Sequence, residues 1–160
     1  MNQKQQSNTI EIFIDADACP VREETYKVAL RHNVPVQVVS NSYLRILEHP
    51  LISRTIVSDS FDAADDFIAE RAGPNTITVT ADILLADRCL KAGSLVIAPN
   101  GKPFTPDSIG SAIAVRAIMA DLRAGVGNEN IGGPPPFQNS DRSRFLQTLH
   151  ESVLTLKRSV

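Results

Sequence analysis

Five short runs rich in β-branched residues recur along this chain of 160 residues. The runs that predict strands are residues 10–14, 36–39, 54–57, 76–79 and 95–98. Helix start signals or helical periodicity follow most of them. Strands that alternate with helices favour a parallel sheet, because each crossover helix returns the chain to the same sheet edge. We therefore predict an α/β fold around a five-stranded, mainly parallel sheet.

The expected helices cover residues 20–32, 61–72, 82–92, 105–125 and 140–160. Pro20 suits the first turn of the first helix, and Ser60 is a candidate cap for the second. The long helix carries an apolar stripe of Ile109, Ala112, Val115, Met119 and Leu122. The last helix places Leu146, Leu149, Val153 and Leu156 on one face, so we expect it to pack on the domain or on a partner chain.

The chain divides into four expected parts. Residues 1–8 are a polar, disordered tail, residues 9–125 form the α/β domain, residues 126–139 are a Gly/Pro-rich loop, and residues 140–160 form the C-terminal helix. No sequence pattern shows the oligomeric state, so a homo-oligomer stays open.

Composition excludes several classes of protein. The net charge of -2 gives no overall electrostatic footprint for nucleic acid. The longest apolar run is too short to span a membrane, and the polar N-terminus does not resemble a secretory signal, so we expect a cytoplasmic protein. Cys19 and Cys89 lie far apart without a CxxC or Cys/His cluster, which favours reduced thiols over a zinc site.

Aspartates gather where the predicted strands end. Asp15 and Asp17 follow the first strand, Asp82 follows the fourth, and Asp62 and Asp65 begin the helix before the fourth. In a parallel sheet these positions meet at one edge, where several carboxylates repel one another unless a cation is present. Oxygen ligands favour Mg²⁺ or Mn²⁺, which can activate water against a phosphodiester. The pattern therefore predicts a metal-dependent nuclease.

Each acid also has a structural interpretation. Asp62, Asp65 and Asp82 are as well explained as helix caps or as charges that complement a helix dipole. Asp17 can cap the helix that begins near Pro20. For Asp15 the functional interpretation is favoured, because a carboxylate that ends a buried strand is costly to desolvate. Cys19 is a possible nucleophile at a helix N-terminus, although a small buried thiol explains it more simply.

Basic residues near the C-terminus offer a contact surface for nucleic acid. Arg142 and Arg144 lie beside Phe145, so they can contact phosphate while the ring stacks on a base. Arg116 on the long helix can reach the crevice at the sheet edge where the aspartates meet. The simpler interpretation is an amphipathic helix that begins with salt bridges.

Several motifs together resemble those of the YaiI/YqxD family of uncharacterised bacterial proteins. They are DADACPVREE, NS, FDAADDFI, TADILLADRCLKAG, GKPFTPDSIG, and GGPPPF followed by DRSRFLQ, and they span residues 10–149. That family is similar to PIN-like domains, so the resemblance implies a three-layer α/β/α sandwich. The ribonucleases among PIN-like domains bind Mg²⁺ or Mn²⁺ with acids at the ends of strands one and four. The resemblance implies a site built from Asp15, Asp82 of the Thr-x-Asp motif, and Asp62 or Asp65.

Three functions remain open at this point. The leading hypothesis is a Mg²⁺- or Mn²⁺-dependent nuclease that hydrolyses RNA, with Asp15 and Asp82 as catalytic residues. The alternative is a non-catalytic module that binds RNA or a partner protein on the same fold. A phosphotransferase with Asp15 as nucleophile ranks third, because Ala18, Cys19 and Pro20 do not follow the usual pattern of such enzymes.

Overall fold

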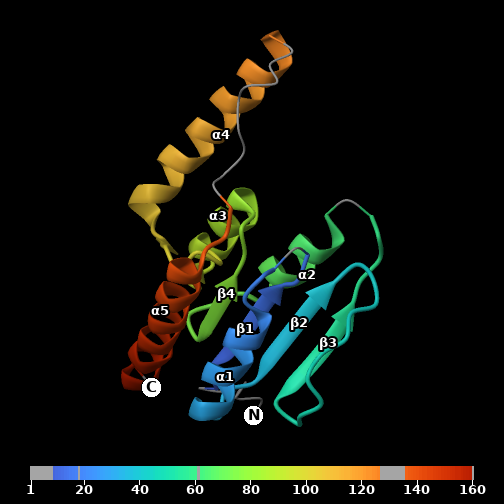
Figure 1. The fold of residues 1–160 in the computed structure, drawn as a ribbon, viewed down its shortest axis with the longest axis vertical. Helices are drawn as coiled ribbons and strands as arrows, with labels where there is room; N and C mark the ends of the chain where they lie inside the picture. The colour runs from blue at the N-terminus through green and yellow to red at the C-terminus, as the bar shows by residue number, and fades with distance from the viewer. Residues whose placement is uncertain (1–8, 18, 61, 127–135, 160) are drawn as a thin grey trace, which may run out of the picture.

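A computed structural model of the protein describes residues 9–17, 19–60, 62–126 and 136–159. Within them a six-stranded sheet has the order β3-β2-β1-β4-β5-β6 (Figure 1). The strands are β1 (Glu11–Asp15), β2 (Val36–Ser40), β3 (Ile52–Ile56), β4 (Thr76–Val79), β5 (Leu95–Ile97) and β6 (Pro103–Phe104). The first five are parallel and β6 is antiparallel, which confirms an α/β fold with a mainly parallel sheet.

The predicted number of five strands is wrong, because β6 adds a sixth. It contains two residues and pairs Phe104 with Val96 across a tight turn. Gly101 supplies a positive φ of 85° in that turn, and a Cβ there would lie 2.5 Å from the Phe145 nitrogen. A two-residue strand that begins with Pro103 has no alternating pattern, so turn signals were the only feature of this segment visible in the sequence.

The described residues form five helices: α1 (Arg22–His32), α2 (Ala63–Arg71), α3 (Ile83–Lys91), α4 (Pro106–Val126) and α5 (Asn139–Arg158). Pro20 lies in a turn before α1 rather than in its first turn. Ser60 does not cap α2, because its hydroxyl instead hydrogen-bonds the Ser58 hydroxyl at 2.7 Å. The predictions for residues 1–8 and 127–135 lie outside the described residues.

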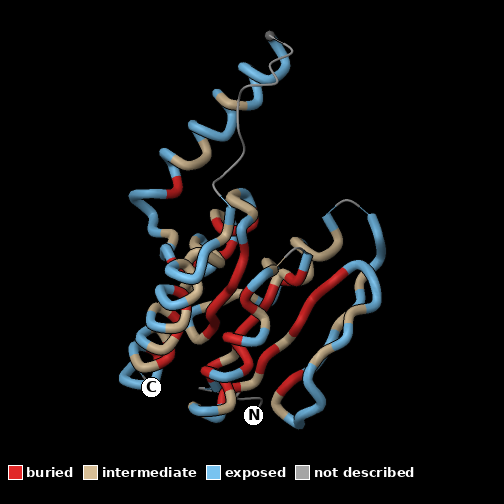
Figure 2. Tube along the Cα trace, viewed as in Figure 1, coloured by how far each residue is buried: buried red, intermediate tan, exposed pale blue. Residues whose placement is uncertain are grey.

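Alternate residues of β1 pack against different helices. Ile12 and Ile14 belong to a buried cluster that includes residues of α1 and α5. Phe13 points to the opposite side and joins a second cluster with residues of α2 and α3. Since successive side chains of a strand face opposite sides of the sheet, the two clusters place helices on both faces. The core is red in the burial view (Figure 2).

Helix α5 packs closely against α1. Phe145, Leu149 and Val153 are fully buried in the cluster beneath it. His32 and His150 bring their ring nitrogens within 2.8 Å between the two helices. The C-terminal helix is therefore an integral part of the fold, although some 100 residues separate it from α1 in the sequence.

Helix α4 has an apolar stripe but projects away from the domain (Figures 1 and 2). Ile109, in its first turn, is buried. Farther along, Val115 and Ile118 are each 57% exposed and Leu122 is 45% exposed. The periodicity thus predicted the helix correctly, but Val115 and Leu122 of its stripe are exposed. No helix among the described residues is long and apolar enough to cross a membrane.

The strand order explains where a site can form. The chain runs from β1 outward to β2 and β3, and then returns to place β4 on the other side of β1. At such a switch point the connections from two neighbouring strands diverge and leave a crevice beyond their carboxyl ends. Asp15 ends β1, and Thr80 to Asp82 follow β4 at this edge.

Candidate functional site at the sheet edge

A cavity of about 540 Å³ lies at the switch point, and we call it the acidic cavity. All five predicted metal ligands line it: Asp15, Asp17, Asp62, Asp65 and Asp82. Its other polar lining residues are Asn41, Ser60, Arg88 and Arg116. The structure therefore brings together acids from β1, from the connection after β4, and from the beginning of α2.

Asp15 is held in place by Thr80. The Thr80 hydroxyl donates a hydrogen bond of 2.8 Å to Oδ2 of Asp15, and the Asp82 backbone N–H donates one of 3.0 Å to the same hydroxyl. Thr80 is 1% exposed. The threonine of the Thr-x-Asp motif thus connects the two strand ends and fixes the orientation of the Asp15 carboxylate.

The cavity carries excess negative charge at its inner end. Burial, with a smaller contribution from the charges of Asp65, Asp17 and Asp82, raises the pKa of Asp15 to about 6, although the Thr80 hydrogen bond opposes the rise. Burial also raises the pKa of Asp65, with Asp82 and Asp62 adding to the effect and Arg88 opposing it. Ionisation of Asp15 is therefore less favourable than that of an exposed aspartate, and a positive charge in the cavity would favour it.

The structure shows which of three aspartates cap a helix through their side chains. Asp82 is the N-cap of α3, because its Oδ1 accepts hydrogen bonds from the backbone N–H groups of Leu84 (2.9 Å) and Leu85 (3.1 Å). Asp62 occupies the N-cap position of α2 without making a side-chain cap bond. Asp17 does not cap α1, whose N-cap residue is Val21. Asp82 therefore has a structural role whether or not it also binds a ligand.

The predicted arginine contacts divide into two groups. Arg116 is exposed and lines the acidic cavity. Arg142 instead forms an ion pair with the buried Glu24, and Arg144 donates to the Asn100 carbonyl at 3.3 Å. Neither of these two lines the acidic cavity. The simpler interpretation of an amphipathic helix with salt bridges accounts for both of these contacts.

The donor atoms of the cavity suit a hard divalent cation, since carboxylates are the side chains that Mg²⁺ and Mn²⁺ prefer. Burial raises the pKa of Asp15, and a cation bound beside this carboxylate would favour its ionised form. In the described part of the chain, however, no group of three or more His, Cys, Asp or Glu side chains is already arranged to hold a metal ion. Binding would therefore require carboxylate side chains to rotate toward the ion.

Cys19 does not have the properties of a reactive nucleophile. Burial raises the pKa of its thiol to about 11, while a backbone hydrogen bond from Val21 and the charge of Arg22 oppose the rise. The thiol is therefore protonated at neutral pH, and a protonated thiol is a weak nucleophile.

Sequence reasoning missed the contributions of Thr80, Asn41 and Arg88 to the site. Thr80 was quoted only as part of a motif, although a polar residue at the buried end of a strand already calls for a hydrogen-bond partner. Asn41 follows β2 and meets the same sheet edge. Arg88 lies one and a half turns into α3 and had no signal of its own.

Fold and site together define an α/β protein with an acidic cavity at the switch point of a mainly parallel sheet. The family model described as "Uncharacterized BCR, YaiI/YqxD family" matches residues 13–155. The chain therefore belongs to the YaiI/YqxD family, which confirms the resemblance seen in its motifs.

Curated bacterial relatives extend this match over nearly the whole chain. A "UPF0178 protein" of Sphingopyxis alaskensis is 66% identical over 149 residues, which cover 93% of this chain and 96% of the relative. Proteins of the same name from Nitrobacter winogradskyi and Jannaschia sp. are 55% and 54% identical, over 94% and 91% of this chain and 94% of each relative. No solved structure matches this chain.

Proposed function

We propose that the protein is a PIN-like nuclease that uses Mg²⁺ or Mn²⁺ to hydrolyse phosphodiester bonds in RNA. The observation that carries this proposal is the acidic cavity, where five carboxylates meet at the switch point of the sheet. Purely structural acids seldom gather where their charges raise one another's pKa, so a cluster of this kind favours a functional role.

The carboxylates of Asp15, Asp65 and Asp82 would hold the ion, with Asp17 and Asp62 nearer to solvent as further oxygen donors. A divalent cation bound there would neutralise charge on a phosphodiester and activate water for attack on phosphorus. Thr80 is a positioning residue, because its hydroxyl orients the Asp15 carboxylate. Arg116 is exposed at the cavity and is available to contact a phosphate oxygen.

The test is cleavage of a labelled single-stranded RNA by purified protein with Mn²⁺ or Mg²⁺. We expect Asp15→Asn to lower the cleavage rate by at least about 100-fold, since even residues that only support a metal ligand cost 10–100-fold when changed. Asp82→Asn should also lower the rate while keeping the α3 cap, because Asn caps a helix as well as Asp does.

Asp107→Asn is the matched control, because Asp107 is exposed on α4 and does not line the acidic cavity. Its cleavage rate should equal that of the unchanged protein. Cleavage that persists unchanged in both Asp15→Asn and Asp82→Asn would disprove the proposal, as it would assign the activity to a contaminant or to another site.

A non-catalytic binding module is the second candidate. It is favoured by the lack of a ready-made metal site in the described residues and by the capping role of Asp82. Calorimetric titration with Mn²⁺ separates the two functions. Binding of one ion per chain supports the nuclease, whereas no heat at millimolar Mn²⁺ supports the module.

A further inference from the structure

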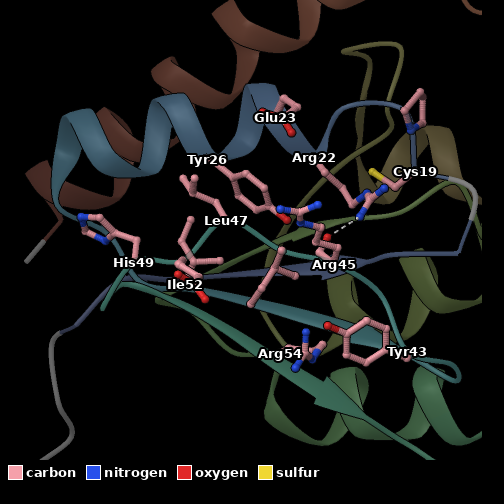
Figure 3. A pocket seen from close by; sticks show the side chains of 13 residues that line it. Cys19, Arg22, Glu23, Tyr26, Tyr43, Arg45, Leu47, His49, Ile52 and Arg54 are labelled. Carbon is pink, nitrogen blue, oxygen red and sulfur yellow. Dashed lines mark hydrogen bonds between the residues drawn. The ribbon is translucent and has the colours of Figure 1, made fainter.

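A second and larger cavity, of about 1280 Å³, lies between α1 and the segment 43–54 (Figure 3). We call it the arginine–tyrosine cavity after Arg22, Arg45, Arg54, Tyr26 and Tyr43, all of which line it. Pockets for small ligands usually measure about 300–1,000 Å³, so this volume suits an extended ligand better.

The three guanidiniums are available to an anion. Within the described residues none of these arginines forms an ion pair, whereas Arg71, Arg88, Arg142 and Arg144 do. Glu23 and Glu48 line the cavity as well, so its charge is positive by one. Guanidinium groups bind phosphate oxygens through paired hydrogen bonds, which makes a phosphorylated ligand the best chemical match.

Tyr43 provides a surface on which a base can stack. The ring is 71% exposed, which is unusual for an aromatic side chain, and the Arg54 guanidinium lies 4.4 Å from its centroid. A hydrogen bond of 2.9 Å from Arg54 to the Leu44 carbonyl holds that guanidinium in place. Exposed aromatic rings beside arginines are the usual stacking platforms for single-stranded nucleic acid.

Tyr26 adds an independent sign of a missing ligand. Its side chain is 3% exposed, and its hydroxyl has no hydrogen-bond partner of normal geometry among the described residues. In Figure 3 the hydroxyl end of Tyr26 points toward Arg22 and Arg45. A buried hydroxyl without a partner costs free energy, and a phosphate oxygen bound between these arginines would give it one.

A third cavity shares lining residues with each of the other two. This smaller cavity, of about 320 Å³, shares Cys19, Pro20 and Arg22 with the arginine–tyrosine cavity and shares Asp17 with the acidic cavity. A strand that occupies the larger cavity can therefore extend past Arg22 to the acids.

We propose that the arginine–tyrosine cavity binds two or more nucleotides of a single-stranded RNA whose scissile phosphate lies in the acidic cavity. The inference rests on the proposed function only in placing the scissile phosphate in the acidic cavity. Binding of RNA in the arginine–tyrosine cavity does not itself require cleavage. Bases stack on Tyr43, phosphates pair with Arg45 and Arg54, and Tyr26 donates to the phosphate nearest Arg22.

The test is fluorescence anisotropy with a labelled 12-nucleotide single-stranded RNA in EDTA, where cleavage does not occur. We expect Arg45→Glu and Tyr43→Ala each to weaken binding about tenfold, as loss of a stacked base or a phosphate contact does. Arg45→Ala should also lower the slope of log affinity against log salt by about 0.7, the value for one phosphate contact on a single strand.

Tyr26→Phe is the most specific variant, because it removes a buried hydroxyl that has no hydrogen-bond partner of normal geometry and has only a weak interaction with Arg22. The melting temperature should stay the same or rise, while the affinity for RNA falls about threefold, within the usual range for one hydrogen bond. Arg158→Glu is the matched control for charge. Arg158 is exposed on α5, lines none of the three cavities, and should leave binding unchanged.

The outcomes separate this inference from the proposed nuclease. If the cavity variants bind like the unchanged protein while Asp15→Asn abolishes cleavage, the inference fails and the nuclease stands. If the variants lose binding but no metal supports cleavage, the inference stands and the nuclease fails. Equal displacement of the RNA by poly-glutamate, or a stronger affinity for duplex RNA of the same length, would overturn the inference in favour of a general anion surface or a duplex site.

Discussion

The acidic cavity and the arginine–tyrosine cavity each border the same smaller cavity, but the fold holds their charges in different ways. In the acidic cavity Asp15 is bound by the buried Thr80, and Asp82 caps α3. In the other cavity Arg45 and Arg54 are exposed and form no ion pair within the described residues. The acids of the first cavity are therefore coupled to stability, whereas Arg45 and Arg54, which have no carboxylate partner among the described residues, are available to an anionic ligand.

Removal of the Asp15 charge should give the largest change in stability. The pKa of this acid is raised to about 6 in the folded protein, so its ionisation destabilises the fold. We expect Asp15→Asn to raise the free energy of unfolding by about 2 kcal/mol at pH 8, given about 1.4 kcal/mol per pKa unit with an allowance for solvent screening. Urea unfolding measures this change, and Arg45→Gln, as the counterpart in the other cavity, should stay within about 0.5 kcal/mol of the unchanged protein.

The sign of this effect depends on pH. Below about pH 3 the carboxyl is protonated in both folded and unfolded chains, so the variant and the unchanged protein should be equally stable. As the pH rises from about 4 to about 6, the unfolded chain ionises first, and the unchanged protein loses stability that Asp15→Asn retains. If Asp15→Asn were less stable than the unchanged protein at pH 8, the ionised carboxylate would stabilise the fold. The proposed contrast between the two cavities would then be wrong.

Binding of Mn²⁺ should show the next largest effect. The ion competes with a proton for Asp15, whose pKa is raised to about 6 by burial and by the neighbouring carboxylates. We therefore expect the affinity for Mn²⁺ to fall about tenfold between pH 7 and pH 5, because only about a tenth of this carboxyl is ionised at pH 5. Calorimetry at both pH values measures it. Binding of RNA in EDTA should not show this dependence if it takes place in the arginine–tyrosine cavity.

The sequence predicted those parts of the fold and of the site that depend on where the strands lie and end. All five parallel strands were located correctly in order, since β-branched runs such as Val36–Ser40 carry a strong local signal. Once those strands are placed in a parallel sheet, the positions of Asp15 and Asp82 follow from geometry alone. The five acids of the cavity could therefore be named before the structure was known.

The parts that were not predicted depend on contacts between distant segments. The arginine–tyrosine cavity is formed largely by the segment 43–54. Most of this segment precedes β3 and has no periodicity to show which side chains face α1. The pairing of His32 with His150 and of Glu24 with Arg142 likewise needs the packing of α5 on α1. The exposed stripe of α4 shows the same limit, because periodicity reports the helix but not its neighbours.

Loss of the Asp82 cap should have a moderate effect. Asp82→Ala removes both acceptor bonds to the first turn of α3, and we expect the free energy of unfolding to fall by about 1 kcal/mol. Asp82→Asn should change it by no more than a few tenths of a kcal/mol, since Asn remains a good cap. Equal stability of Asp82→Ala, Asp82→Asn and the unchanged protein in thermal unfolding would show that the cap does not contribute to stability. Asp82 would then resemble Arg45 and Arg54 in having no structural role.

The smallest effect should come from Arg88, the arginine that lines the acidic cavity from α3. Its guanidinium pairs with Asp66 at 2.8 Å, but both side chains are about half exposed, at 45% and 53%. Arg88→Gln should therefore lower the free energy of unfolding by no more than about 0.5 kcal/mol, as is usual for an exposed ion pair. Because the pair already engages the guanidinium, RNA binding in EDTA should change less than twofold. A tenfold loss would mean that the acidic cavity shares the phosphate contacts, so the two cavities would then act as one binding surface.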